Sequence, residues 1–68
     1  MIEVEIGQYW EDLTKEVGKI VDILPNGKAR IKMSDRNMFN LVPESLVQYG
    51  RLMSKQEVIK WTLKNGEL

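Results

Sequence analysis

The sequence predicts a mostly β domain that ends in one α-helix. Three local patterns support this prediction: an alternating segment at residues 2–6, a Pro-Asn-Gly turn at residues 25–27 and a helix-capping sequence at residues 54–57. The first two are typical of strands and hairpins, and the third is typical of a helix start. The 68 residues suffice for one domain, since a chain of this size buries roughly 60% of its unfolded surface.

The first expected strand is residues 2–6, where apolar and acidic residues alternate without interruption. This alternation is the pattern of a half-buried strand, and it turns Ile2, Val4 and Ile6 toward the interior. A glycine ends the strand. We expect residues 8–16 to form an irregular loop before the next strand begins.

A hairpin is predicted next, with strands at residues 19–24 and 28–33. Its turn is Pro25-Asn26-Gly27, because proline presets φ while asparagine and glycine tolerate positive φ at low cost. A second turn, rich in residues that bond their own backbone, is expected at residues 34–37 and leads to a strand at 38–42.

The segment after this strand predicts a tight turn and a short closing strand. In Pro43-Glu44-Ser45-Leu46 the proline fixes φ and removes an amide from any ladder, which favours one 3₁₀-like turn. Val47-Gln48-Tyr49 is then expected to form the last strand, which Gly50 ends.

The final element is predicted to be a helix over residues 55–65. Ser54 and Glu57 have the spacing of a capping box, in which each side chain bonds the backbone amide of the other residue. Met53 and Val58 stand where an accompanying hydrophobic staple forms. A glycine follows at the position typical of a helix end.

The order of these elements resembles that of SH3-like barrels. Ile6-Gly7-Gln8 and the segment Val17-Gly18-Lys19-Ile20-Val21-Asp22-Ile23 look like the glycine-marked strands of KOW- and Tudor-type barrels. Leu41-Val42-Pro43-Glu44-Ser45-Leu46-Val47 looks like the closing segment of such domains. The resemblance covers residues 2–49 and is one of pattern, without a particular family.

This resemblance implies a small five-stranded SH3-like barrel at residues 1–50. Residues 51–68 would add one C-terminal α-helix packed on the barrel, so that the chain remains a single domain. The tryptophan pair and the Ala-Leu-Tyr-Asp-Tyr-like motif of peptide-binding SH3 domains are missing. Their absence argues against proline-rich ligands.

The apolar side chains of the predicted helix spread over roughly half its circumference at about 100° per residue. This arc consists of Val58, Ile59, Trp61, Thr62 and Leu63. Either Trp61 covers the open end of the barrel and Leu63 packs on a flank, or part of the arc contacts a second subunit.

The composition limits the chemistry that is open to the chain. It contains no cysteine and no histidine, which most zinc, copper and haem sites and most nucleophilic triads require. We therefore expect no enzymatic activity, no metal or other cofactor, and no small-molecule substrate. The start of the chain is acidic, and no segment has the length and apolarity of a membrane span, so a cytoplasmic protein without membrane association is expected.

Net charge is zero, but the charges are separated along the chain. Residues 1–24 are mostly acidic, whereas residues 25–36 and the C-terminal segment are mostly basic. This asymmetry indicates a surface with an acidic and a basic side.

The basic side offers a candidate nucleic-acid contact at Lys28, Arg30, Lys32 and Arg36. The first three follow one another at a spacing of two, so a strand projects them from one face. Such a row could follow a phosphate backbone. The simpler interpretation is a solvated hairpin face paired with acids such as Asp22.

A candidate partner surface combines Tyr9, Trp10, Tyr49 and Trp61. Exposed aromatics beside acidic residues could hold a cationic ligand or a base, although one of two adjacent aromatics commonly packs inward in a small barrel. We therefore expect a non-enzymatic module that binds a protein partner or itself, with nucleic-acid binding through the basic hairpin as the alternative.

Overall fold

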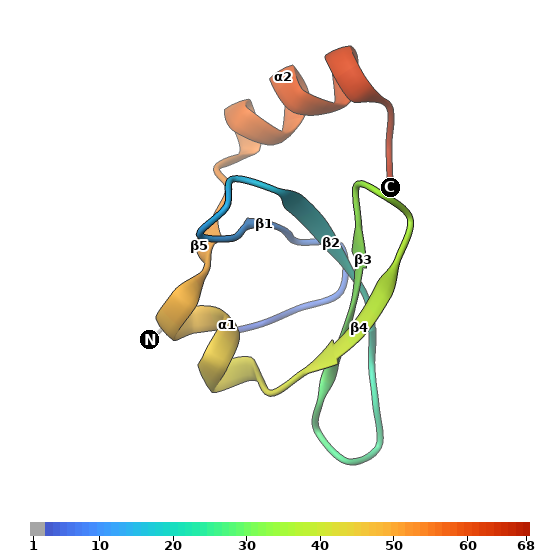
Figure 1. The fold of residues 1–68 in the computed structure, drawn as a ribbon, viewed down its shortest axis with the longest axis vertical. Coiled ribbons are helices and arrows are strands. Elements are labelled where there is room, and N and C mark those ends of the chain that lie inside the picture. Colours follow the sequence, from blue (N-terminus) through green and yellow to red (C-terminus); the bar gives the residue numbers. More distant parts are fainter. Residues whose placement is uncertain (1–2) are drawn as a thin grey trace.

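The computed structural model describes residues 3–68, which form one open five-stranded antiparallel sheet and two helices (Figure 1). The strands are β1 (Tyr9–Glu11), β2 (Val17–Ile23), β3 (Ala29–Met33), β4 (Met38–Leu41) and β5 (Arg51–Leu52). The helices are α1 (Pro43–Tyr49) and α2 (Lys55–Asn65). The strands lie in the order β4-β3-β2-β1-β5, so in the described part of the chain β4 and β5 are the edges of the sheet and the predicted closed barrel is not seen.

The predicted hairpin is confirmed as β2 and β3. The Leu24 amide donates to the Lys28 carbonyl at 2.8 Å, and Gly27 has the positive φ of +85° that its turn position requires. The register shifts between Ile20 and Asp22, which places one extra residue on β2. This bulge increases the local twist and helps the sheet to curl.

The main core lies on the concave face of the curled sheet. Trp10 of β1 and Ile20 of β2 are its largest fully buried side chains, and Leu46 of α1 covers them from the opposite side. Strand β3 contributes every second residue, namely Ala29, Ile31 and Met33. Burying one large apolar side chain stabilises the fold by about 1.5–3 kcal/mol relative to exposure.

The predicted first strand is wrong for its described part, residues 3–6, while Ile2 lies outside the described residues. The side-chain amide of Gln8 accepts from the Glu5 amide at 2.9 Å and donates to the Glu3 carbonyl at 2.8 Å. These bonds satisfy the backbone locally, without a partner strand. Val4 packs on the core as expected, but Ile6 is 62% exposed.

The predicted loop at residues 8–16 instead contains β1, the strand between β2 and β5. Tyr9 and Trp10 point to opposite faces of the sheet, as neighbours on a strand must, and both faces are covered there. The strand has only three residues and its two aromatic side chains are buried on opposite faces, so it shows no alternation of apolar and polar side chains that could reveal it.

Residues 43–49 form the helix α1, so the predicted 3₁₀-like turn followed by a strand is wrong. Proline at the first helical position has a suitable φ and lacks only an amide that would be unpaired there. The closing strand is Arg51–Leu52, which lies just beyond the expected barrel boundary at residue 50.

Helix α2 is confirmed with the predicted bounds and capping box. The Glu57 amide donates to the Ser54 hydroxyl at 3.2 Å, and the Ser54 amide donates to the Glu57 carboxylate at 3.0 Å. Gly66 follows the helix at φ +86°. Neither described helix is long and apolar enough to cross a bilayer.

Helix α2 lies across one end of the sheet, over a second apolar cluster (Figure 1). This cluster contains Tyr9, Val17 and Met53, with Val58, Trp61 and Leu68 packed against it. The rings of Tyr9 and Trp61 are 6.0 Å apart at 54°. Trp61 therefore covers the sheet, whereas Leu63 is 83% exposed and does not pack on a flank.

Candidate interaction surfaces

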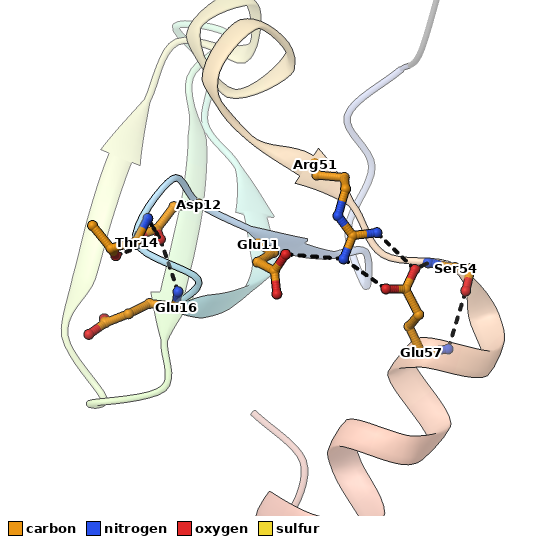
Figure 2. A network of polar contacts seen from close by, with 7 residues as sticks. All are labelled: Glu11, Asp12, Thr14, Glu16, Arg51, Ser54 and Glu57. Atoms are coloured by element: carbon orange, nitrogen blue, oxygen red, sulfur yellow. Dashed lines mark hydrogen bonds and ion pairs between the residues drawn. The ribbon is translucent and has the colours of Figure 1, made fainter.

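The loop between β1 and β2 is held in shape by Asp12. One carboxylate oxygen accepts from the Thr14 hydroxyl at 2.7 Å and from the amides of Thr14 and Glu16 at 2.9 Å (Figure 2). Slight burial raises the pKa of Asp12, but the bonds from Thr14 and Glu16 outweigh this effect, so that the pKa is lowered. Asp12 therefore contributes a fixed negative charge to a well-ordered loop.

A polar network next to this loop joins β1, β5 and α2 (Figure 2). Arg51 donates to Glu57 of α2 and to Glu11 of β1, with ion-pair distances of 2.7 and 3.1 Å. Hydrogen bonds from Arg51 are the main cause that lowers the pKa of Glu57 to about 2. The same bonds raise the pKa of Arg51.

A hollow of about 290 Å³ opens between this loop and strands β3 and β4. Its apolar lining consists of Trp10, Ile31, Met33, Phe39, Leu41 and Leu46. Its acidic lining consists of Glu11, Asp12, Glu16 and Asp35. The hollow thus has apolar walls and a rim of carboxylates.

A second hollow, of about 300 Å³, adjoins the first along α1. The two share Asp12, Leu41 and Leu46, and the second adds Leu13 and Tyr49 among its lining residues. We call the two hollows together the acidic groove. No lysine or arginine lines either of them within residues 3–68.

Several large apolar side chains of the acidic groove are open to solvent. Leu13 is 78% exposed, Tyr49 57% and Phe39 50%. Single exposed apolar residues are common, but a group of them around one concavity marks a surface that binds something. The groove is therefore a candidate interaction site.

The four residues of the predicted partner surface fall into two groups: Tyr9 and Trp61 pack together under α2, and Trp10 and Tyr49 line the acidic groove. Tyr9 and Trp10 are 5% and 2% exposed, so their side chains offer almost no surface to a partner. Trp61 is half-buried against Tyr9, and Tyr49 lines the acidic groove. Of the four, only Tyr49 is open to solvent and lies in a concavity.

Two of the four basic residues of the predicted nucleic-acid contact, Arg30 and Lys32, share one face of β3. Arg30 and Lys32 alternate on β3 with the buried Ala29, Ile31 and Met33. Lys28 precedes the strand, and Lys19 of β2 lies directly opposite Lys32. Arg36 stands apart in the β3–β4 turn, at φ +72°.

The expected ion pairs of this face with acids are not formed among residues 3–68. Asp22 is the register partner of Arg30, but its carboxylate accepts from the neighbouring Ile23 amide. Arg30 instead donates to Asn40 at 3.4 Å. Among residues 3–68 the ion pairs are those of Arg51 alone, so no carboxylate forms an ion pair with the basic face. Lys19 instead lies over the ring of Tyr9, with its Nζ 5.7 Å from the ring centre.

Sequence reasoning did not find the acidic groove, although one signal was present. Phe39 and Leu41 alternate on β4 and lie on the same side as the core residues of β3. Leu13 is an apolar residue in a turn between Asp12 and Thr14, a position where burial of an apolar side chain is not expected. The groove itself depends on α1, which the sequence did not predict as a helix.

The described residues contain no cluster of three or more histidine, cysteine, aspartate or glutamate residues that could hold a metal ion. Comparisons with protein-family models, curated proteins and solved structures find no match to this chain. The function is therefore argued from the chain's own surfaces.

Proposed function

We propose that this chain is a small non-enzymatic interaction module that binds a protein segment in the acidic groove. The observation that carries the proposal is the coincidence, in one concavity, of exposed apolar side chains and unpaired carboxylates. Leu13, Phe39 and Tyr49 supply the apolar surface, while Asp12 and Glu16 supply charge without an ion-pair partner among the described residues.

We further propose that the fold is an SH3-like barrel in its topology. Strand order β4-β3-β2-β1-β5, with a hairpin-connected run and the last strand beside the first, supports this assignment. The short helix α1 lies where a 3₁₀-like turn was expected before the last strand. Fold alone says little about function, so the groove and not the topology supports the binding proposal.

The chemistry of the acidic groove favours a protein segment with both apolar and cationic side chains. Removal of the apolar walls from water is the main favourable contribution to binding. The carboxylate rim selects the charge of the partner and speeds its approach. A polyanion would be repelled here.

Site-specific photo-cross-linking in cells tests this proposal. A photoreactive residue in place of Phe39 or Tyr49 should give a defined covalent adduct with a protein, whereas one in place of Lys28, on the basic face, should not. Leu13→Lys should weaken the groove adduct, because it removes apolar surface from the wall and adds a positive charge that repels a cationic segment. Leu13 is already 78% exposed, so folding should not change. Equal cross-linking from both faces would contradict the proposal, as would none from the groove.

The basic face supports a second candidate function, nucleic-acid binding. Lys19 lies opposite Lys32, and Arg30 lies two residues before Lys32 on the same face of β3, so three cations share this face. Three phosphate contacts predict a slope of about −2.7 for log affinity against log salt on duplex DNA. Binding that is absent at low salt, or unchanged in a Lys19→Glu/Lys32→Glu variant, would rule this function out.

A further inference from the structure

Helix α2 presents an apolar ridge that its own domain does not cover. Ile59 and Leu63 are one turn apart and are 50% and 83% exposed. Side chains at this spacing lie on the same helix face. The helix fully buries none of its residues, so its packing on the sheet is confined to the opposite side.

The charges beside this ridge are all positive. Lys60 and Lys64 follow Ile59 and Leu63 by one residue each, and Lys55 is four residues before Ile59. The one carboxylate of α2, Glu57, faces Arg51 and forms an ion pair with it at 2.7 Å. The exposed face of α2 is therefore apolar with a lysine border.

This ridge and the acidic groove are complementary in their apolar surface and in their charge. The groove offers apolar walls with a carboxylate rim, and the ridge offers apolar side chains with a lysine border. No residue of α2 lines either hollow, so the ridge does not fill the groove of its own chain.

We propose that the acidic groove receives the α2 ridge of a second copy of this chain. This inference rests on the proposed function, because it names the partner of that same groove. An amphipathic helix in an apolar groove is a recurrent mode of protein recognition, with anchors one turn apart such as Ile59 and Leu63. Opposite charges at the border fix its orientation and add salt dependence.

The contact joins two different patches of the chain. Two copies that exchange ridges form a closed dimer, and copies that do not close the ring form a chain. One helix of 11 residues covers less than the roughly 1,600 Å² of a standard interface, so the association is weak and concentration-dependent.

Sedimentation equilibrium of the full chain over a concentration series tests the inference. The average mass should rise with concentration and fall again in high salt. Leu63→Asp should raise the dissociation constant at least about tenfold, which is the loss of one well-packed apolar anchor. Ile6→Asp is the matched control, because Ile6 is also exposed, at 62%, but belongs to neither surface.

A charge exchange makes the test specific. Glu16→Lys on the groove and Lys60→Glu on the ridge should each weaken association, and an equimolar mixture of the two variants should recover it. Both side chains are exposed and have no hydrogen-bond partner among the described residues, so folding should not change.

The inference is overturned if the parent chain stays monomeric at the highest soluble concentration, or if Leu63→Asp and Ile6→Asp have equal effects. A monomer that still gives a groove cross-link to a different protein in cells would reject self-docking and keep the proposed function. Association that persists without a cross-link from Tyr49 in the purified chain would place the contact elsewhere and reject this inference.

Discussion

Arg51 contacts Glu57 through two parallel hydrogen bonds. Its Nη1 and Nη2 donate to the two carboxylate oxygens at 2.9 and 2.7 Å, the two-point geometry that makes arginine–carboxylate pairs strong and directional. Nη2 also donates to Glu11 at 3.1 Å. The guanidinium thus joins the start of α2 to β5 and β1, beside the apolar contacts of Met53 and Val58.

This contact predicts a pH dependence of stability. Hydrogen bonds from Arg51, and next from the Ser54 amide, lower the pKa of Glu57 from 4.5 to about 2. A carboxylate whose pKa is lower in the folded state stabilises the fold above its unfolded pKa and loses that contribution as pH falls. The stabilisation should be complete above about pH 5 and should decline between about pH 4.5 and pH 2.

Thermal unfolding of the parent and of Glu57→Gln at several pH values measures this contribution. The difference in midpoint between the two should be largest near neutral pH and should shrink below about pH 4.5. Glu67→Gln, an exposed position outside the helix, serves as the control. A difference that stays constant down to pH 2 would show that Glu57 acts only through its packing.

The capping box predicts a separate effect at Ser54. Ser54→Ala removes the acceptor of the Glu57 amide and should lower the free energy of unfolding by about 1 kcal/mol. Ser54→Asp keeps an acceptor at the same position and should cost much less. Urea unfolding of the three proteins gives the comparison, and equal losses in both variants would contradict the capping role.

Much of the fold could be predicted because the informative signals are local. The Pro-Asn-Gly turn and the Ser54–Glu57 capping box depend on residues within one turn of each other, and both are confirmed. The alternation at residues 3–6 wrongly predicted a strand. The side chain of Gln8 bonds backbone groups of this segment, so the segment needs no partner strand. Strand β1 and helix α1 were missed because their state depends on distant packing around Trp10 and Leu46.

The candidate surfaces were less predictable than the fold. The basic row was visible because a strand turns every second residue to one face, and Lys28, Arg30 and Lys32 have that spacing. The acidic groove brings together the Asp12 loop, β4 and α1, which are far apart along the chain. Sequence alone could not show that Tyr9 and Trp10 face opposite covered sides.

The half-buried position of Trp61 predicts a moderate cost for its removal. A tryptophan enclosed on all sides loses about 3–5 kcal/mol on truncation, but Trp61 has one covered face, against Tyr9. Trp61→Ala should therefore lower the free energy of unfolding by about 2 kcal/mol. Tyr49→Ala, at a side chain that is 57% exposed, should change it by less than about 0.5 kcal/mol. Denaturant unfolding measures both, and equal costs would show that Trp61 does not pack on the sheet.

The last prediction concerns Gly50, which joins α1 to β5. A Cβ added there would lie 2.7 Å from the Leu46 carbonyl oxygen, which also accepts the Gly50 amide at 2.7 Å. The Leu46 oxygen is a backbone atom, so it cannot rotate away. The added Cβ would also lie 3.4 Å from the ring of Trp10. Gly50→Ala should lower the free energy of unfolding by about 1–3 kcal/mol, as overpacking of a tight site does.

The sign of this effect is diagnostic, because Gly50 has an ordinary φ of −107°. Glycine to alanine at a compatible position raises stability by about 0.4–1 kcal/mol through the unfolded state. Urea unfolding should therefore show a loss where backbone conformation alone predicts a gain, with the exposed Gln48→Ala of α1 as the reference. A stabilised Gly50→Ala variant would mean that α1 can move away from β5, and the groove that α1 borders would then adapt its width to what it binds.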